Sequence, residues 1–137
     1  MTSKQVFLCS TLLLAGTVLA DSLSGEDRFL CSAVEATVCT DNGVCESGAA
    51  WDWQIPQFLV VDLDRKLLST TQASGENRAT PILSLTRQDG QIVLQGVQTG
   101  RAFSMVLNEV DGRTTIAIAT DGVTINVFGA CTPTSGV

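Results

Sequence analysis

Residues 84–127 read SLTRQDGQIVLQGVQTGRAFSMVLNEVDGRTTIAIATDGVTINV, and this stretch decides the fold. Short runs of β-favouring residues are separated by four dipeptides: Asp89-Gly90, Thr99-Gly100, Asp111-Gly112 and Asp121-Gly122. Such dipeptides favour the two-residue turns of β-hairpins, and their spacing is typical of successive short strands. The stretch therefore predicts an antiparallel meander of five strands.

The pairing of these strands can be predicted by counting outward from each two-residue turn. Residues that oppose one another across a pair share a face of the sheet, and a slip of one residue would move a strand's apolar side chains to the other face. The counting gives one consistent face, with two rows: Leu85, Leu94, Met105, Ile118 and Ile125, then Arg87, Ile92, Leu107, Ile116 and Val127. The agreement of four turns supports the meander.

Three further strands are expected upstream of the meander. Residues 58–63 and 67–71 read as a hairpin around Asp64-Arg65-Lys66, and residues 29–39 read as an opening strand. The expected fold is all-β: a single small domain formed by an antiparallel up-and-down meander of about eight strands. We expect these strands to form a closed or nearly closed barrel, with a β-sandwich as the alternative.

The N-terminus has the pattern of a secretory signal. Lys4 is followed by an uncharged, mostly apolar stretch over residues 6–20, and small residues precede Asp21. A membrane-spanning helix would need a longer apolar run, of about 20 residues. We therefore expect residues 1–20 to be a cleaved signal peptide and residues 21–137 to be one exported domain, periplasmic or secreted.

Four cysteines follow the expected cleavage point, and in an oxidising compartment they would form two disulfides. Among the three possible pairings, Cys39 with Cys45 is favoured because Asn42-Gly43 predicts a turn between them. Cys31 with Cys131 then follows by elimination, and it would join the first strand to the last. A zinc site is the competing interpretation, but the chain has no histidine and no CxxC pair, so no metal is expected.

Charge is the second feature that restricts function. The chain carries a net charge of −6, which disfavours nucleic acid and anionic membranes as partners. No later segment is apolar enough to span a membrane as a helix.

Between Ala79 and Cys131 the charged residues lie at or beside turns, which leaves the second face of the meander neutral. An opposing sheet, a second copy or a partner could cover that face, or it could be a plain solvated surface rich in Ser and Thr.

Few residues offer catalytic chemistry. The absence of histidine and tyrosine, together with oxidised thiols, excludes the common nucleophilic hydrolase arrangements. Asp62 and Asp64 could form a carboxylate pair, but the neighbouring Arg65 and Lys66 favour a plain charged hairpin tip. Trp51 and Trp53 are candidate binding residues for a sugar or a peptide, and they could also plug one end of the barrel.

Three functions from different classes are compatible with these patterns. The leading hypothesis is an exported non-catalytic interaction protein of the cell envelope or exterior, with a protein or glycan partner. An inhibitor of a basic hydrolase would fit its charge. The alternative is a carrier of a small apolar ligand in a lipocalin-like barrel, and the third is a carboxylate- or metal-dependent enzyme. We expect no enzyme activity and no cofactor, and the oligomeric state is not predicted.

Overall fold

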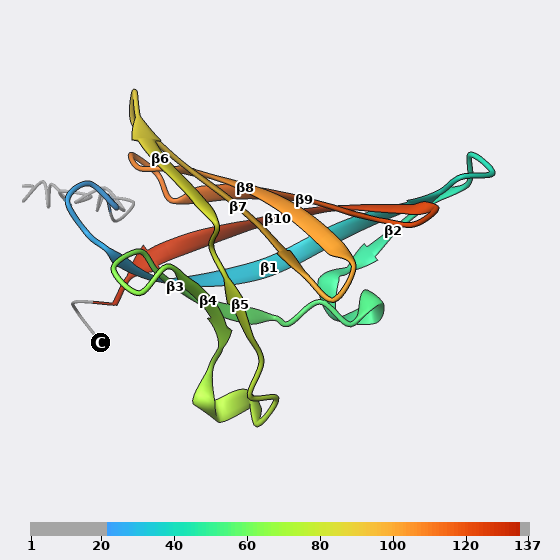
Figure 1. Cartoon of the computed structure of the whole chain (residues 1–137), viewed down its shortest axis with the longest axis horizontal. Helices are drawn as coiled ribbons and strands as arrows, with labels where there is room; N and C mark the ends of the chain where they lie inside the picture. Colours follow the sequence, from blue (N-terminus) through green and yellow to red (C-terminus); the bar gives the residue numbers. More distant parts are fainter. Residues whose placement is uncertain (1–21, 135–137) are drawn as a thin grey trace, which may run out of the picture.

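A computed structural model describes residues 22–134, which form one curled antiparallel sheet of ten strands (Figure 1). The expected signal peptide, residues 1–20, lies outside the described residues. The strands are β1 (Arg28–Thr40), β2 (Cys45–Ala49), β3 (Phe58–Asp62), β4 (Leu67–Thr70), β5 (Ala79–Pro81), β6 (Ser84–Gln88), β7 (Gln91–Gln98), β8 (Arg101–Asn108), β9 (Arg113–Thr120) and β10 (Val123–Pro133). Two short 3₁₀ turns interrupt them, η1 (Ala50–Trp53) and η2 (Gln72–Ser74). The prediction of an all-β fold with a meander is confirmed.

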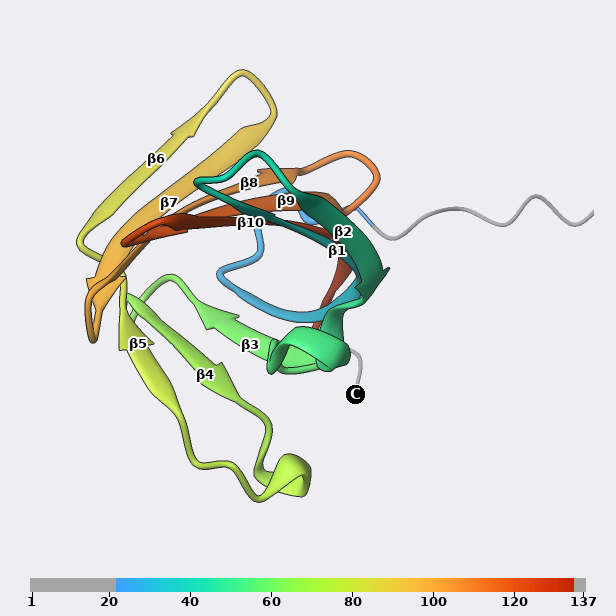
Figure 2. The same ribbon diagram turned by 90° about the vertical axis from the view of Figure 1, so that its right-hand side faces the viewer.

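The sheet curls into a half-barrel, as the end-on view shows (Figure 2). Its strand order is β5-β4-β3-β1-β10-β9-β8-β7-β6, so the two edge strands, β5 and β6, are neighbours in the chain. The edges meet at one corner, where Gln98 on β7 donates from Nε2 to the carbonyl oxygen of Ala79 on β5 at 2.7 Å. Side chains thus join β5 to β7. Within residues 22–134, no backbone ladder joins the two edge strands, so the expected complete closure of the barrel is not confirmed. Among the described residues, no helix is long and apolar enough to cross a membrane.

The segment that connects the edges explains why the structure has more strands than the expected eight. One additional strand, β5, precedes β6, which is the predicted first strand of the meander, and the two strands pair with different neighbours. Ile82 donates its N–H to Lys66 O at 2.8 Å, beside β4, and Leu83 donates to Gln95 O on β7, also at 2.8 Å. The change of partner bends the chain between these two residues. The other additional strand is β2, which pairs with β1 alone.

The predicted register is correct at three of the four turns and wrong at Asp111-Gly112. Met105 pairs with Ile116 rather than with Ile118. The turn is longer than two residues: Gly112 donates its N–H to Asn108 O at 2.9 Å, and Val110 donates to Asn108 Oδ1 at 2.8 Å. These bonds place residues 109–112 in the turn and shift the pairing by two residues. A shift of two keeps every side chain on its predicted face, so the apolar pattern could not reveal it.

The core fills the concave side of the curl. Its largest fully buried side chains are Phe29, Leu23, Ile92, Leu94, Met105, Leu107, Val61 and Val127. Those on the meander belong to the face that the sequence predicts to be apolar. Period-two alternation of apolar and polar residues is therefore the property that determines which side of the sheet packs inward.

β1 organises the sheet because it has neighbours along both edges. One edge pairs with β10, and the other pairs first with β3 and then with β2. A bulge between Ala33 and Glu35 separates these two partners. Opposite the bulge, a Cβ atom on Gly129 would lie only 2.0 Å from Ser32 O, so the close approach of the two strands requires glycine.

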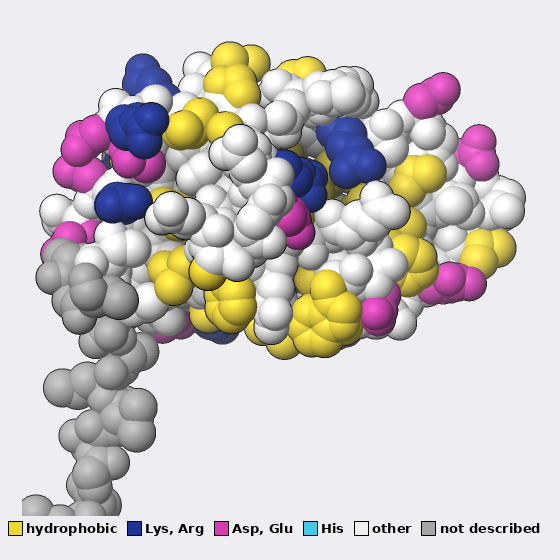
Figure 3. Space-filling view, turned by 90° about the horizontal axis from the view of Figure 1, so that it is seen from below, with side chains coloured by type: hydrophobic (Ala, Val, Ile, Leu, Met, Phe, Trp, Pro, Cys, Tyr) yellow, Lys and Arg dark blue, Asp and Glu magenta, His cyan; other side chains and the backbone are white. Residues whose placement is uncertain are grey.

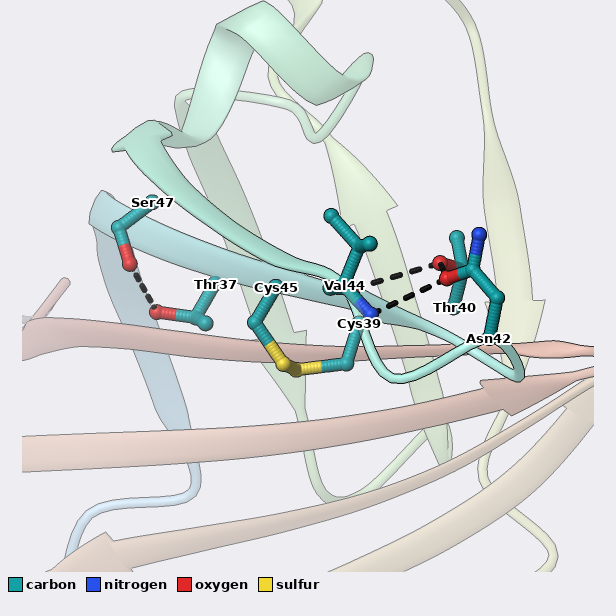
Figure 4. The surroundings of a disulfide bond; sticks show 7 residues. All are labelled: Thr37, Cys39, Thr40, Asn42, Val44, Cys45 and Ser47. Carbon is teal, nitrogen blue, oxygen red and sulfur yellow. Dashed lines mark hydrogen bonds between the residues drawn. A yellow bond between two sulfur atoms is a disulfide. The ribbon is translucent and has the colours of Figure 1, made fainter.

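Both predicted disulfides are present. Cys31 and Cys131 are direct partners on β1 and β10, with an S–S distance of 2.01 Å, and they join the ends of the domain. Cys39 and Cys45 are partners across the β1–β2 hairpin, with an S–S distance of 2.04 Å (Figure 4). At the tip of this hairpin, Asn42 Oδ1 accepts a hydrogen bond from the Val44 N–H at 3.0 Å. Disulfides are typical of oxidising, exported environments.

Candidate functional site

One end of the half-barrel is sealed by the segment that precedes β1. Leu23 is fully buried there, and its N–H donates to Glu109 O at 2.7 Å. Arg87, a cation on the otherwise apolar face, holds this segment in place. Its Nε donates to Glu109 Oε1 at 2.6 Å. Its other nitrogens reach Leu23 O at 3.1 Å, Glu26 O at 3.0 Å and Asp27 Oδ1 at 3.1 Å. We refer to Arg87 and Glu109 as the clamp.

The open flank of the half-barrel contains a cavity of about 110 Å³, which we call the hollow. It lies between β4 and β5 on one side and β7, β8 and β9 on the other. Figure 3 shows Lys and Arg side chains beside a hollowed region of this face, with apolar side chains within it. The apolar lining is Ile55, Pro56, Leu59, Leu68, Phe103, Ile116 and Ile118, and the polar lining is Ser69, Thr70, Arg78, Thr80, Gln98 and Arg101.

Arg78 reaches the hollow because the loop before β5 is fixed to β4. The buried hydroxyl of Thr70 accepts a hydrogen bond from the Arg78 N–H at 2.9 Å, and the Thr70 N–H donates to Arg78 O at 3.0 Å. The Arg78 guanidinium donates from Nη1 to Gln54 O at 3.3 Å and lies 3.5 Å from Glu76 Oε2. This ion pair is largely exposed, and such pairs contribute little to stability.

Arg101 reaches the hollow from the opposite side, at the β7–β8 turn. Thr99 and Gly100 both have positive φ, 50° and 75°, as a two-residue hairpin turn requires. Arg101 pairs with Gln98 directly after that turn. Gln98 is occupied by Ala79 O and by the hydroxyl of Thr80. Among residues 22–134, no carboxylate oxygen lies within 4.0 Å of the Arg101 guanidinium.

Phe103 provides the aromatic part of the lining, and Gly96 makes room for it. The two residues are partners on β8 and β7. A Cβ atom on Gly96 would lie 2.5 Å from Phe103 Cε1 and 2.5 Å from Pro81 O. Glycine at this position therefore lets the ring lie close to β7 and lets the β5 corner approach the same strand.

The two tryptophans, candidate binding residues from the sequence, differ in their surroundings. They lie on the 3₁₀ turn η1 rather than on an extended loop. Trp51 is 54% exposed, whereas Trp53 is partly buried and packs against the core, with its Nε1 buried and without a hydrogen-bond partner. Ile55 and Pro56, which follow the turn, line the hollow. The tryptophan segment thus borders the site without placing both rings in it.

The carboxylates singled out from the sequence lie at a hairpin tip. Asp62 Oδ1 accepts a hydrogen bond from the Arg65 N–H at 2.9 Å, and its other oxygen lies 4.0 Å from Arg28 Nε. Asp64 is exposed in the same β3–β4 turn. Within the described part of the chain, no three residues of the types that bind metal are grouped together. Neither aspartate lines the hollow.

The neutral outer face of the meander is exposed, and no second sheet covers it within residues 22–134. A shallow depression of about 640 Å³ lies over part of it. Its lining includes Ser84, Gln95, Val97, Ser104, Ala117, Ala119, Thr124 and Asn126. The prediction that this face carries no charge holds for these residues.

Sequence reasoning missed the polar residues of the hollow. Arg101 could have been found, because counting from the Thr99-Gly100 turn places it on the same face as Phe103 and Met105. A cation on an otherwise apolar face is a signal for function or for a specific partner. Arg78 could not have been found in this way, since it lies in a loop whose position depends on the hydroxyl of Thr70.

Comparisons with models of protein families, with curated proteins and with solved structures find no match for this chain.

Proposed function

We propose that this chain is an exported, non-catalytic binding protein that takes the apolar part of a small ligand into the hollow. One observation carries the proposal: the half-barrel is sealed at one end by Leu23 and the clamp, while its open flank presents an apolar lining with a polar rim. Binding sites of proteins commonly combine an apolar surface with a few convergent polar groups. The rim supplies hydroxyl, amide and guanidinium groups, which suit recognition.

The size of the hollow limits what it can hold. At about 110 Å³ it is smaller than the roughly 300–1,000 Å³ pockets that enclose drug-sized ligands. An apolar cavity of about 150 Å³ accommodates benzene, a ligand of six carbon atoms. The hollow therefore fits the apolar end of a slim ligand, with the polar end of the ligand at the rim.

Filling the hollow tests this function. Leu59, on β3, is partly buried and lines it, so Leu59→Trp should occupy the space and abolish binding. Val44→Trp, at the exposed tip of the β1–β2 hairpin, is the matched control. Binding of 1-octanol can be followed from the NMR signals of the Leu68 and Ile118 methyl groups. Shifts that appear in the wild type and in the control, but not in Leu59→Trp, support the proposal; a wild type that does not respond contradicts it.

A second candidate is interaction with a macromolecule, and the exposure of Trp51 favours it. Trp51 is 54% exposed and Phe58 is 43% exposed, and tryptophan is enriched among residues that dominate binding interfaces. The net charge of −6 suits a basic partner, such as a cationic hydrolase. Inhibition of a panel of basic hydrolases by the wild type, lost in Trp51→Ser and kept in Val44→Ser, would favour this function over ligand binding.

A further inference from the structure

We propose that the ligand of the hollow is a slim monocarboxylic acid with an apolar chain, and that its carboxylate is held by Arg101 with Arg78 nearby. This inference rests on the proposed function, since it names the ligand class of the same site. It predicts a medium-chain fatty acid, with its chain against Leu68, Phe103 and Ile118 and its charged end at the rim.

The distribution of charge carries the argument. The chain has 14 acidic residues and 8 basic ones, yet no acidic residue lines the hollow and two arginines do. Arg28, Arg87 and Arg113 each lie within ion-pair distance of an aspartate or glutamate. Arg101 has no such partner among the described residues. An exposed guanidinium beside an apolar lining is complementary to an anion that has an apolar body.

The polar neighbour of Arg101 is already hydrogen-bonded within the protein. The Arg101 guanidinium is therefore the group that can bind the carboxylate of the ligand. Gln98, directly opposite on β7, already bonds to Ala79 O and to the Thr80 hydroxyl. These bonds hold β5 against the β7–β8 hairpin. They therefore fix the part of the rim that lies between Arg78 and Arg101. A carboxylate at this rim can accept two parallel hydrogen bonds from the planar guanidinium of Arg101.

Arg78 supports the same charged end from the other side of the hollow. Its backbone is fixed by Thr70, and its guanidinium lies 3.5 Å from Glu76 Oε2. Glu76 is 44% exposed, so a ligand carboxylate competes with a weak, solvated ion pair. Removal of the Glu76 charge should therefore strengthen binding of the acid, which a purely apolar site would not show.

The experiment compares octanoate with 1-octanol, which have the same chain length and differ in charge. Titration calorimetry of residues 21–137 should show octanoate binding about tenfold more tightly than 1-octanol. Arg101→Gln should remove this preference and leave the affinity for 1-octanol unchanged, and Arg101→Lys should retain part of it. Glu76→Gln should strengthen octanoate binding by about two- to threefold. Arg113→Gln replaces an exposed arginine that does not line the hollow; it is the control and should behave as the wild type.

The outcomes separate this inference from the proposed function. If 1-octanol binds in the hollow as tightly as octanoate, the assignment of a carboxylate ligand is wrong and the binding function stands. If octanoate is preferred but Arg101→Gln keeps the preference, Arg101 is not the anion-binding group and the inference is overturned. If a hydrophobic peptide with a free carboxyl terminus and 1-octanol bind while octanoate does not, the assignment of a fatty acid is overturned. If neither octanoate nor 1-octanol binds, both proposals fail.

Discussion

Arg87 Nε, on β6, lies 2.6 Å from Glu109 Oε1, in the turn after β8, and the same guanidinium holds the segment that seals the half-barrel. Arg113 Nε lies at the same distance, 2.6 Å, from Asp111 Oδ2, but on the surface. The Arg113 and Asp111 side chains are 78% and 33% exposed, whereas those of Arg87 and Glu109 are 31% and 10% exposed. The two pairs therefore have the same N–O distance and different surroundings.

This contrast predicts unequal costs of removing the two arginines. Arg87→Met leaves the carboxylate of Glu109 buried without its partner and releases the carbonyls of Leu23 and Glu26, so we expect a loss of about 2 to 3 kcal/mol in the free energy of unfolding. Arg113→Met should cost less than about 1 kcal/mol. Urea denaturation of both variants measures the difference. Equal losses would show that the clamp does not hold the sealing segment.

The two disulfides should contribute unequally to stability. Cys31–Cys131 has a sequence separation of 100 residues, and Cys39–Cys45 has one of 6. In the chain-entropy description, replacing the first pair by alanine lowers the free energy of unfolding by about 4 to 5 kcal/mol, and replacing the second lowers it by about 2 kcal/mol. Urea denaturation with linear extrapolation gives both values. A greater loss from the hairpin pair would contradict this ranking.

Gly129 should tolerate no side chain. A methyl group there would overlap Ser32 O, a backbone atom of the paired strand that cannot rotate away, so Gly129→Ala should cost about 2 to 3 kcal/mol. Gly48→Ala is the control, since its Cβ would meet side-chain atoms alone, Asp52 Oδ2 at 3.2 Å and Trp53 Nε1 at 3.6 Å. Thermal denaturation compares the two. If Gly129→Ala has the same melting temperature as the wild type, β1 and β10 separate easily at the bulge.

Asp111 gives a prediction about pH. The backbone N–H of Arg113 donates to Asp111 Oδ1 at 3.0 Å and is the largest single cause that holds the pKa of this carboxyl below its usual value, and the hydrogen bond and charge of the Arg113 guanidinium lower the pKa further. A lowered pKa in the folded state means that this stabilisation is present above the pKa of the unfolded chain and is lost as the pH falls through that of the folded one. NMR titration should find the Asp111 pKa still lowered in Arg113→Ala. A return to the usual value would assign the effect to the guanidinium instead.

The sequence predicts the faces of this sheet better than its connections. Apolar alternation and Gly-containing turns identify the inward side of the meander, and Asn42-Gly43 identifies the hairpin that Cys39 and Cys45 close. The Asp111-Gly112 turn misleads because Asn108 caps a longer loop, and a two-residue shift leaves the faces unchanged.

The hollow escapes sequence reasoning for a related reason. Its walls come from strands that are distant in the chain, β4 and β8, and they face one another only because the sheet curls. The curl depends on the bend between Ile82 and Leu83, whose N–H groups bond to opposite edges of the sheet. Local propensity carries no information about such a change of partner.

The central claim is that the hollow is the binding site, and intermolecular NOEs between octanoate and methyl-labelled protein test it most directly. We expect NOEs from the octanoate chain to the methyl groups of Leu68 and Ile118, which line the hollow. Val93 and Val106, which oppose one another on the other face of the sheet, should give none. NOEs to Val93 and Val106 alone, or no NOEs at all, would contradict the assignment of the hollow as the binding site.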